Sequence, residues 1–465
     1  MNIKLKLLIL IMGLGNSLSI TAQVSSEKNE KPNIIFILAD DMGYNDMGAY
    51  GQKLIVTPNL DQMAQEGIRF TQHYAGSSVC APSRGVLMTG LHTGHSAIRG
   101  NFGMEIEGNL PIPDSAVTVA ELLQEAGYKT GIIGKWGLGG PGSVGGPNNQ
   151  GFDYSFCYLD QRNAHNYYPT YLWRNEEKYM LKGNEDGAQV QYSHDLFTKE
   201  ALKFIKEKNE KPFFLYLPYT IPHGDYVVPD DSPYSEEEWP QNLKNYAAMI
   251  SRMDKDVGDI LNLLKDLEID EKTIVFFTSD NGPSGGVNKK FDSNGPLRGT
   301  KFELYEGGIR IPLVVRWPGN IKPATVSEHI STFWDFLPTA SEISGVTPPA
   351  GIDGISYLPT LLGTDQKNHE FLYWELFNFN YNWSPDSGKP QNPFEKQALR
   401  WNEWKGIRNN LSKDPNAPLE LYNLRKDIGE SEDIASQHPE IVKRIEKLME
   451  EARYDVEFFQ RNKQE

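Results

Sequence analysis

The chain has 465 residues, and its 62 Asp and Glu outnumber its 46 Lys and Arg, giving a formal net charge of −16. Hydrophobic residues make up 39% and aromatic residues 11%, with 42 Gly and 29 Pro, which describes a globular chain with a sizeable core and many turns. Disorder, coiled coil and collagen are excluded. The acidic balance argues against electrostatic binding to nucleic acid or an anionic membrane surface, so an anionic ligand would need a local cationic pocket.

The N-terminus has the pattern of a signal peptide. Lys4 and Lys6 precede an apolar stretch at residues 7–14, and small and polar residues follow as far as Ala22. This stretch is shorter than the roughly 18 apolar residues that a membrane span needs. We therefore predict that residues 1–22 are a signal peptide and that the protein is exported, either periplasmic or secreted, without a membrane anchor.

Short apolar runs recur along the mature chain. They predict buried strands at residues 33–39, 129–133, 212–217, 273–278 and 311–316. Because each run is hydrophobic throughout, we expect parallel strands that are covered on both faces. Helical patterns lie between the runs, for example at residues 118–126 and 246–267. Strands that alternate with helices predict an α/β fold.

Polar residues follow four of these runs. In chain order they are Asp40 and Asp41, Lys135, His223, and Asp280 with Asn281. In open parallel sheets, ligands bind beyond the carboxyl ends of the strands. We therefore expect these side chains to share one site, although capping of the following turn would explain any one of them alone.

The pattern changes beyond about residue 365. Residues 370–377 and 401–407 predict antiparallel strands, and residues 439–453 predict an amphipathic final helix. We therefore divide the mature chain into a large domain at residues 23–365 and a smaller α+β subdomain at residues 366–465.

The chain has two cysteines, Cys80 and Cys157. In an exported protein their number leaves open a single disulfide or two buried thiols. The surroundings of Cys80 favour another role, because Pro82 suits the first turn of a helix and places Cys80 at the N-terminus, where the dipole favours negative charge. Arg84 would project from the same turn as an anion-binding cation. These residues predict an activated nucleophile, whereas no motif surrounds Cys157, which we interpret as a buried thiol.

Residues 80–84 (Cys-Ala-Pro-Ser-Arg), followed by Thr89 and Gly90, resemble the C-x-P-S-R-x4-T-G signature of type I sulfatases, in which a maturation enzyme oxidises the cysteine to formylglycine. Further segments match the same family in order and extend the resemblance over nearly the whole mature chain: 32–43, 131–136, 222–223, 278–282 and 295–312. The resemblance implies an alkaline-phosphatase-like fold, with a mixed, mostly parallel central sheet flanked by helices, and makes residues 23–365 the catalytic domain.

The resemblance also implies a Ca²⁺ ion held by oxygen ligands. The matching positions are Asp40, Asp41, Asp280 and Asn281. Three carboxylates and one amide oxygen suit a hard cation of this kind. By the same resemblance, a formylglycine hydrate made from Cys80 would attack the sulfur of a sulfate ester.

The family pattern gives roles to the cationic side chains. Arg84 would hold the hydrate and Lys135 the sulfate, while Lys301 and His223 would lie near the leaving oxygen and the sulfate. Because a sugar alkoxide is strongly basic, its departure requires a general acid. We assign that role to His223.

One position departs from the family pattern. Many members have a histidine where this chain has Gly137. We predict that His165 replaces it and that Arg162 and Arg174 contact an anionic glycan. Arg298 is a further predicted substrate-binding residue. Gly137 and the stretch at residues 164–169 (AHNYYP) resemble bacterial carbohydrate sulfatases that act on sulfated galactose or N-acetylgalactosamine.

Three functions are therefore compared. The leading hypothesis is an exported, Ca²⁺-dependent carbohydrate sulfatase whose partners are a sulfated saccharide and the formylglycine-generating enzyme. A phosphodiesterase or phosphonate hydrolase of the same superfamily would use a similar metal and nucleophile. A non-catalytic glycan-binding protein would account for Gly137. Release of sulfate by protein with an oxidised Cys80 would distinguish the first hypothesis from the other two.

Overall fold

The computed structural model describes residues 31–104, 107–207, 211–377, 380–383, 394–456 and 459. From Lys31 onward the chain forms one compact unit. The predicted signal peptide lies outside the described residues. Within those residues, no helix has both the length and the apolar character that crossing a bilayer would require.

Eleven strands of the described chain form one mixed sheet. In spatial order they are β11 (Thr325–Ser327), β2 (Ile68–Tyr74), β10 (Arg310–Arg316), β9 (Thr273–Ser279), β1 (Asn33–Ala39), β8 (Phe213–Pro218), β4 (Lys129–Lys135), β5 (Tyr154–Tyr158), β6 (Tyr171–Arg174) and β7 (Glu177–Met180), with β12 (Ser331–Thr332) beside β2. The five strands from β9 to β5 are parallel. This confirms the predicted α/β fold with a mixed, mostly parallel sheet.

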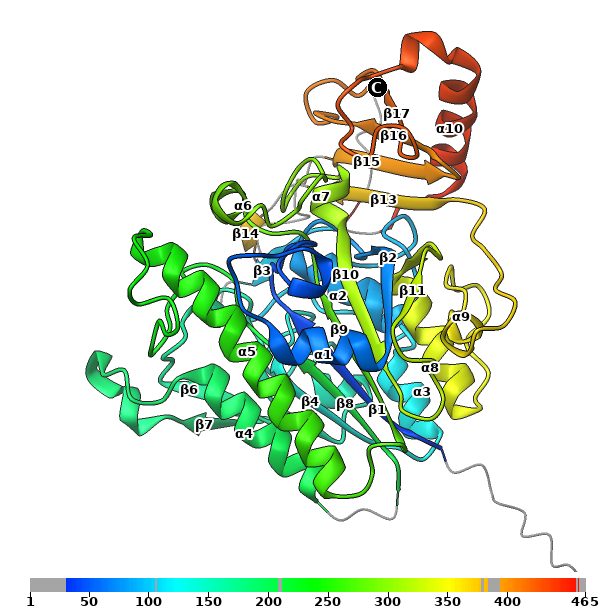
Figure 1. The fold of residues 1–465 in the computed structure, drawn as a ribbon. Coiled ribbons are helices and arrows are strands. Elements are labelled where there is room, and N and C mark those ends of the chain that lie inside the picture. Colours follow the sequence, from blue (N-terminus) through cyan, green and yellow to red (C-terminus); the bar gives the residue numbers. More distant parts are fainter. Residues whose placement is uncertain are drawn as a thin grey trace, which may run out of the picture. The chain divides into compact units, whose positions relative to one another are not determined.

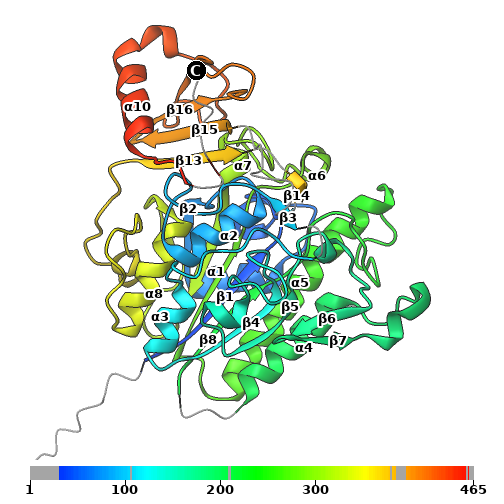
Figure 2. The same ribbon diagram turned by 180° about the vertical axis from the view of Figure 1, so that it is seen from behind.

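Helices cover both faces of the sheet. One face carries α1 (Pro58–Glu66), α4 (Ser193–Lys206) and α5 (Gln241–Asp266), in front in Figure 1. The other carries α2 (Cys80–Thr89), α3 (Val119–Glu125), α8 (Phe336–Ser344) and α9 (Leu358–Leu362); Figure 2 shows α2, α3 and α8 there. Alternate residues of β1 enter the two cores: Ile35 and Ile37 join the first, and Ile34 and Phe36 the second. Burial on both faces explains why the strand is hydrophobic throughout.

The predicted parallel direction is wrong for one strand. The run at residues 311–316 lies in β10, which pairs antiparallel with both β9 and β2. The chain between β9 and β10 contains only the short helices α6 (Gly285–Phe291) and α7 (Glu306–Ile309) and turns back on itself. Because β10 is also buried on both faces, its hydrophobicity does not distinguish it from a parallel strand.

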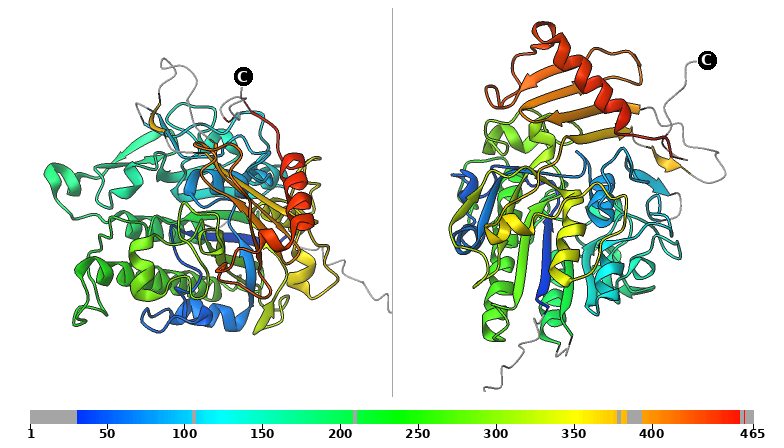
Figure 3. Two further views of the ribbon diagram at one scale, coloured as in Figure 1. Left: turned by 90° about the horizontal axis from the view of Figure 1, so that it is seen from above. Right: turned by 90° about the vertical axis from the view of Figure 1, so that its right-hand side faces the viewer.

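The C-terminal part forms a second, antiparallel sheet. Its strands, in order, are β13 (Leu372–Phe377), β15 (Phe394–Trp401), β16 (Trp404–Arg408) and β17 (Glu420–Asn423), and α10 (Pro439–Glu451) packs on one face. Figure 3 shows this sheet and helix at the end of the main sheet toward which β1 runs. A separate parallel pair joins β14 (Asn380–Trp383) to β3 (Phe102–Met104).

In the C-terminal part of the chain, one prediction is wrong and another is confirmed. The run at residues 401–407 is not one strand, because Asn402, with a φ of 55°, makes the turn between β15 and β16. The final helix is confirmed as α10, with Ile445 and Leu448 buried. The domain boundary at residue 365 stays a prediction.

Both cysteines are free and buried. The disulfide alternative is therefore wrong for this structure, and the interpretation of Cys157 as a buried thiol is confirmed. Cys157 lies in β5, paired with Gly134 of β4, and belongs to the hydrophobic core.

Candidate active site

The polar residues predicted at strand ends meet at one edge of the sheet. The strands β9, β1, β8 and β4 are adjacent and parallel, so their carboxyl ends lie side by side. The backbone ladder continues past the strands, since Asp280 N donates to Ala39 O (3.0 Å) and Asp40 N donates to Ile221 O (3.1 Å). The sheet therefore fixes the backbone on which these side chains are mounted.

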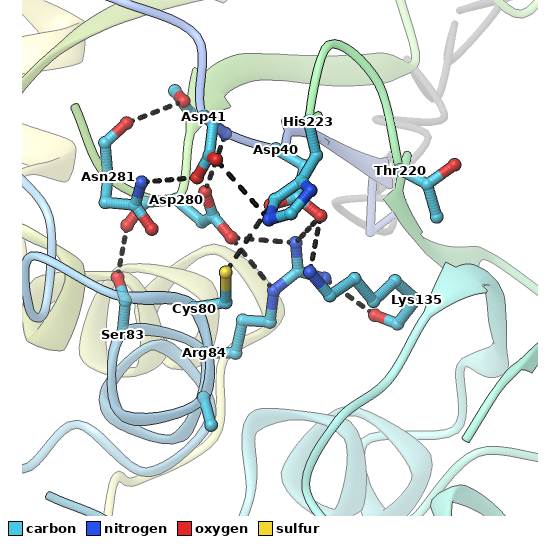
Figure 4. A network of polar contacts seen from close by, with 12 residues as sticks. Asp40, Asp41, Cys80, Ser83, Arg84, Lys135, Thr220, His223, Asp280 and Asn281 are labelled. Carbon is cyan, nitrogen blue, oxygen red and sulfur yellow. Dashed lines mark hydrogen bonds and ion pairs between the residues drawn. The ribbon is translucent and has the colours of Figure 1, made fainter. Parts of the chain in front are cut away.

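Helix α2 brings Cys80 to this edge. Cys80 is the first residue of the helix, as predicted, and Val79 is an extended N-cap residue. Ala81 N donates to Asn101 Oδ1 (2.9 Å), and Ser83 Oγ donates to Asp280 O (2.6 Å). These two bonds tie the first turn of α2 to the rest of the site, and Figure 4 shows the sulfur directed toward the carboxylates.

Cys80 lies between a carboxylate and an ammonium group. Its Sγ is 3.5 Å from Asp40 Oδ1 and 3.6 Å from Lys301 Nζ. Burial raises the pKa of the thiol to about 12, although Lys135 and Lys301 oppose this. Since the thiolate is the nucleophilic form of cysteine, the unmodified side chain is a poor nucleophile here.

Buried cations pair with two of the carboxylates. Arg84 donates from Nε (3.1 Å) and Nη2 (2.8 Å) to Asp280 Oδ2, and Lys135 Nζ donates to Asp40 Oδ2 (2.6 Å). Burial would raise the pKa of Asp40, but positive charges, Lys135 foremost, bring it below its ordinary value. For Asp280, burial and the charge of Asp40 raise the pKa despite Arg84. Asp280 is thus easier to protonate than an exposed aspartate, although Arg84 lies beside it.

Asp41 and Asn281 complete the predicted metal site. Asn281 Nδ2 donates to Asp41 Oδ1 (2.7 Å), and Asp41 N donates to Asp280 Oδ1 (3.1 Å). Within the described chain, Asn281 Oδ1 is buried and has no hydrogen-bond partner. A buried oxygen without a donor, beside three carboxylates, fits a hard cation that takes oxygen ligands.

A second set of potential ligand atoms overlaps the predicted one. One oxygen each of Asp40 and Asp41, Cys80 Sγ and a ring nitrogen of His223 lie within 4.8 Å of one another. Only Asp40 and Asp41 belong to both sets. The chemistry of the oxygen donors favours the predicted set for Ca²⁺, because sulfur and imidazole suit softer metals.

His223 and His165 form a stacked pair. Their ring centroids are 4.2 Å apart and their planes differ by 23°. His223 Nε2 lies 3.5 Å from Asp41 Oδ2, and its Nδ1 donates a hydrogen bond to Gly224 O. Burial, assisted by Lys301, lowers the pKa of His223; burial, assisted by His223, lowers the pKa of His165 to about 3.

A cavity of about 240 Å³ opens onto these residues. The predicted site residues that line it are Asp41, Cys80, Arg162, His165, His223 and Lys301. Arg84, Lys135, Asp40, Asp280 and Asn281 are buried beside it. Arg174 and Arg298 are not among the residues that line this cavity, so their roles as substrate contacts stay predictions. Arg298 donates to Glu430 O (2.6 Å) and stacks on Tyr305.

Seven further lining residues were not predicted as site residues, and Asn101 and Gln161 are among them. Neither lies in the motif of residues 80–84 or at the end of a predicted strand. Asn101 is fixed by its bond from Ala81 N, and Gln161 lies against Gly137. Contacts between segments distant in sequence place both of them, so no local signal marks them.

Comparisons with known proteins show to which protein family this site belongs. The family model described as Sulfatase matches residues 32–346, and the model described as N-sulphoglucosamine sulphohydrolase, C-terminal, matches residues 300–455. The chain belongs to the sulfatase family. It is a sulfuric ester hydrolase, which confirms the resemblance seen in the motifs.

Similar proteins extend over most of the chain. N-acetylgalactosamine-6-O-sulfatase of Bacteroides thetaiotaomicron is 30% identical over 92% of this chain and 94% of its own length. N-acetylgalactosamine-6-sulfatase of Homo sapiens is 34% identical over 74% of this chain and 68% of its own. The crystal structure of Ps i-CgsB in complex with k-i-k-neocarrahexaose superposes with a TM-score of 0.77, at 29% identity, covering 91% of this chain and 92% of that one.

Proposed function

We propose that this sulfatase removes sulfate from N-acetylgalactosamine or galactose units of a sulfated glycan, with the 6-sulfate as the first candidate. The observation that carries the proposal is the buried cluster of Cys80, carboxylates and cations beneath a cavity, in a chain similar over 92% of its length to an N-acetylgalactosamine-6-O-sulfatase. The predicted signal peptide supports action outside the cytoplasm.

Cys80 is proposed to act after oxidation to formylglycine by a maturation enzyme. Its buried, protonated thiol supports this, because the thiol itself is a weak nucleophile. The hydrated aldehyde would supply an oxygen nucleophile in the position of Sγ. Arg84, which is held by Asp280 and by Lys135 O (2.7 Å), is placed to fix the geometry around that oxygen.

Asp40, Asp41, Asp280 and Asn281 are the proposed ligands of Ca²⁺. The orphan oxygen of Asn281 and the raised pKa of Asp280 support a cation here. A bound Ca²⁺ would offset charge on sulfate oxygens and favour the ionised form of a nearby hydroxyl.

Lys135 and Lys301 are proposed to bind the sulfate, and His223 to give a proton to the departing sugar oxygen. Lys301 Nζ and His223 Nε2 both approach Asp41 Oδ2, at 2.8 and 3.5 Å, so a group beside Asp41 would reach both. The bond from Nδ1 to Gly224 O orients the His223 ring. His165, which stacks on His223, is proposed to support that ring. Arg162 is proposed to contact the glycan at the cavity wall.

The experiment is sulfate release by protein expressed together with a formylglycine-generating enzyme. The substrates are 6-sulfated N-acetylgalactosamine and galactose, 6-sulfated N-acetylglucosamine, a 2-sulfated uronate and one phosphodiester. We expect release from a galacto-configured sugar and none from the phosphodiester. Preference for the glucosamine or uronate sugar would overturn the proposed substrate, and preferential cleavage of the phosphodiester would overturn the proposed activity.

A further inference from the structure

Gln161 is a cavity-lining residue without an assigned role. It is only 5% exposed, and in the described part of the chain its Nε2 is buried without a hydrogen-bond partner. An unpaired amide donor in a protein interior costs free energy unless a ligand or a water molecule accepts from it. The side chain therefore has unused hydrogen-bonding capacity at the wall of the active site.

The backbone explains how Gln161 reaches this position. The segment after β5 runs beside the segment after β4, because Trp136 N donates to Tyr158 O (2.9 Å) and Gly137 N donates to Leu159 O (3.2 Å). Gln161 N then donates to Asn109 Oδ1 (3.0 Å), which holds the residue after it leaves the strand. Gln161 is thus fixed at its backbone, while Nε2 of its carboxamide stays available for another partner.

Gly137 makes room for the carboxamide. A Cβ at Gly137 would lie 2.6 Å from Gln161 Nε2 and 2.8 Å from Gln161 Cγ, both closer than real contacts allow. Gly137 also has a φ of +78°, which glycine adopts without strain. The space beside position 137 is thus filled by the side chain of Gln161, so the absence of a side chain at 137 does not leave a void.

The surroundings of Gln161 suit an anion. Lys301 lines the same cavity with its ammonium group 3.6 Å from Cys80 Sγ. Asn101 uses its oxygen to accept from Ala81 N, which leaves its NH₂ group at the wall. Amide N–H groups and an ammonium group that line one cavity can all donate to the oxygens of a sulfate. The terminal torsion of Gln is broad, so its NH₂ can turn from Gly137 to the cavity.

We propose that Gln161 is a substrate-binding residue whose carboxamide N–H donates to an oxygen of the sulfate group, and that Gly137 is required because it leaves space for this carboxamide. The inference rests on the proposed function, in that it takes a sulfate ester as the ligand of the cavity. A carboxamide neither takes up nor releases a proton at neutral pH, so Gln161 acts by binding and leaves proton transfer to other groups.

The test compares two variants of the full-length, matured protein. Gln161→Met removes the donor at similar length, and Gln161→Glu keeps the shape but places an acceptor against the anion. Steady-state kinetics give kcat and KM, and inhibition by inorganic sulfate gives a binding constant without the sugar. For Gln161→Met we expect KM and the sulfate inhibition constant to rise about tenfold, with kcat within about threefold because the contact is made before and during reaction. Gln161→Glu should raise both constants further.

Gln62→Met, on the exposed face of α1, is the matched control and should behave as the wild type. Unchanged KM and sulfate inhibition in both Gln161 variants would overturn the inference while leaving the sulfatase activity of the wild type intact. If the wild type released sulfate from no sugar, the proposed function would fail, and calorimetric binding of inorganic sulfate would still test Gln161. Should Gln161→Met fail to fold, Gln161→Glu serves alone.

A double variant tests the packing of Gln161 against Gly137. Gly137→Ala should raise KM, because the new methyl group displaces the carboxamide. In a Gln161→Ala background the same change should raise KM less, since the clash has been removed. Equal effects of Gly137→Ala in both backgrounds would show that the two residues do not compete for this space.

Discussion

At the scale of single residues, the chemistry of the site depends on how burial and neighbouring charges set each protonation state. The thiol of Cys80 is protonated at neutral pH because burial outweighs two nearby ammonium groups. The same burial makes His165 and His223 less basic. The protein thus places a protonated thiol near two imidazoles whose pKa values lie below the ordinary value.

Replacing the proposed nucleophile should separate catalysis from folding. Cys80→Ala should abolish sulfate release while leaving the thermal midpoint close to that of the wild type, because a buried thiol without a strong bond is replaced by a smaller apolar group. Mass spectrometry of the peptide that contains residue 80 checks the oxidation in the wild type. Normal turnover by the variant would contradict the assignment of the nucleophile.

The pH profile should identify the proton donor. A donor must be protonated, and the pKa of His223 lies below its ordinary value of about 6.5. We therefore expect kcat/KM to fall as the pH rises, with a midpoint below 6.5. Lys301 has a raised pKa, so if it were the donor no fall would occur at neutral pH. The thermal midpoint measured over the same pH range controls for unfolding.

His165 should contribute through His223. His165→Ala removes the ring stacked at 4.2 Å and should lower kcat by about tenfold or more, since general acid catalysis contributes about 10²- to 10⁴-fold and depends on orientation. His438→Ala, a half-exposed residue of the C-terminal part, is the matched control. A rate for His165→Ala equal to that of the control would remove His165 from the site.

Metal binding should be visible in stability as well as in activity. At about 100 times its dissociation constant, Ca²⁺ should stabilise the wild type by about 2.7 kcal/mol. Asn281→Ala should reduce this gain and lower activity, with partial recovery in excess Ca²⁺, because one oxygen ligand is lost. Thermal unfolding with Ca²⁺ and with chelator measures both proteins. Full activity of the wild type in chelator would contradict the metal site.

At the scale of elements, the site is assembled from strand ends and one helix N-terminus. Four adjacent parallel strands present polar residues at one edge, and α2 adds Cys80 and Arg84. The first turn of α2 lacks a side-chain cap from Val79. Asn101, from the loop that follows the helix, supplies an acceptor to Ala81 N instead.

Removing this acceptor should weaken the start of α2. Asn101→Ala should lower the free energy of unfolding by about 1 kcal/mol, the usual cost of losing a cap, and should also lower activity because Cys80 precedes the freed N–H. Asn101→Asp keeps the acceptor, so its stability should exceed that of Asn101→Ala, while its charge should weaken sulfate binding. Chemical denaturation and KM measure the two effects. Equal stability of Asn101→Ala and the wild type would show that the bond is not important.

At the scale of the whole molecule, buried charges join the C-terminal sheet to the rest of the enzyme. Lys405 of β16 lies 2.9 Å from Glu306 Oε1, in α7, and 2.9 Å from Glu430 Oε1. Trp374 of β13 donates from Nε1 to Ala75 O, just beyond β2 (2.9 Å). The second sheet is therefore tied to the segments that lead into the active site.

Breaking this charge cluster should destabilise the entire protein. Lys405→Met should lower the free energy of unfolding by about 3–5 kcal/mol, because two buried carboxylates lose their common cation. Adding Glu430→Gln to that variant should recover part of the loss, since one uncompensated charge is removed. Denaturation of the three proteins measures the effect. A stability of Lys405→Met equal to that of the wild type would show that the cluster does not hold the two sheets together.

The sequence by itself determined the strands β1, β4, β8 and β9, the position of Cys80 at the start of a helix, and the meeting of polar residues at one sheet edge. These follow from local hydrophobicity, from turn chemistry and from the rule that parallel strands place their carboxyl ends together. The sulfatase motif then gave those residues a chemical meaning that hydrophobic patterns do not contain.

Only the tertiary structure decided the antiparallel direction of β10, the stacking of His165 on His223 and the occupation of the space beside Gly137 by Gln161. Each of these depends on segments that are separate in the sequence and meet only after folding. Burial on both faces gives parallel and antiparallel strands the same pattern, and a glutamine after a strand has no local feature that shows which cavity it will line. Packing between distant segments, which local residue patterns do not encode, therefore completes the active site.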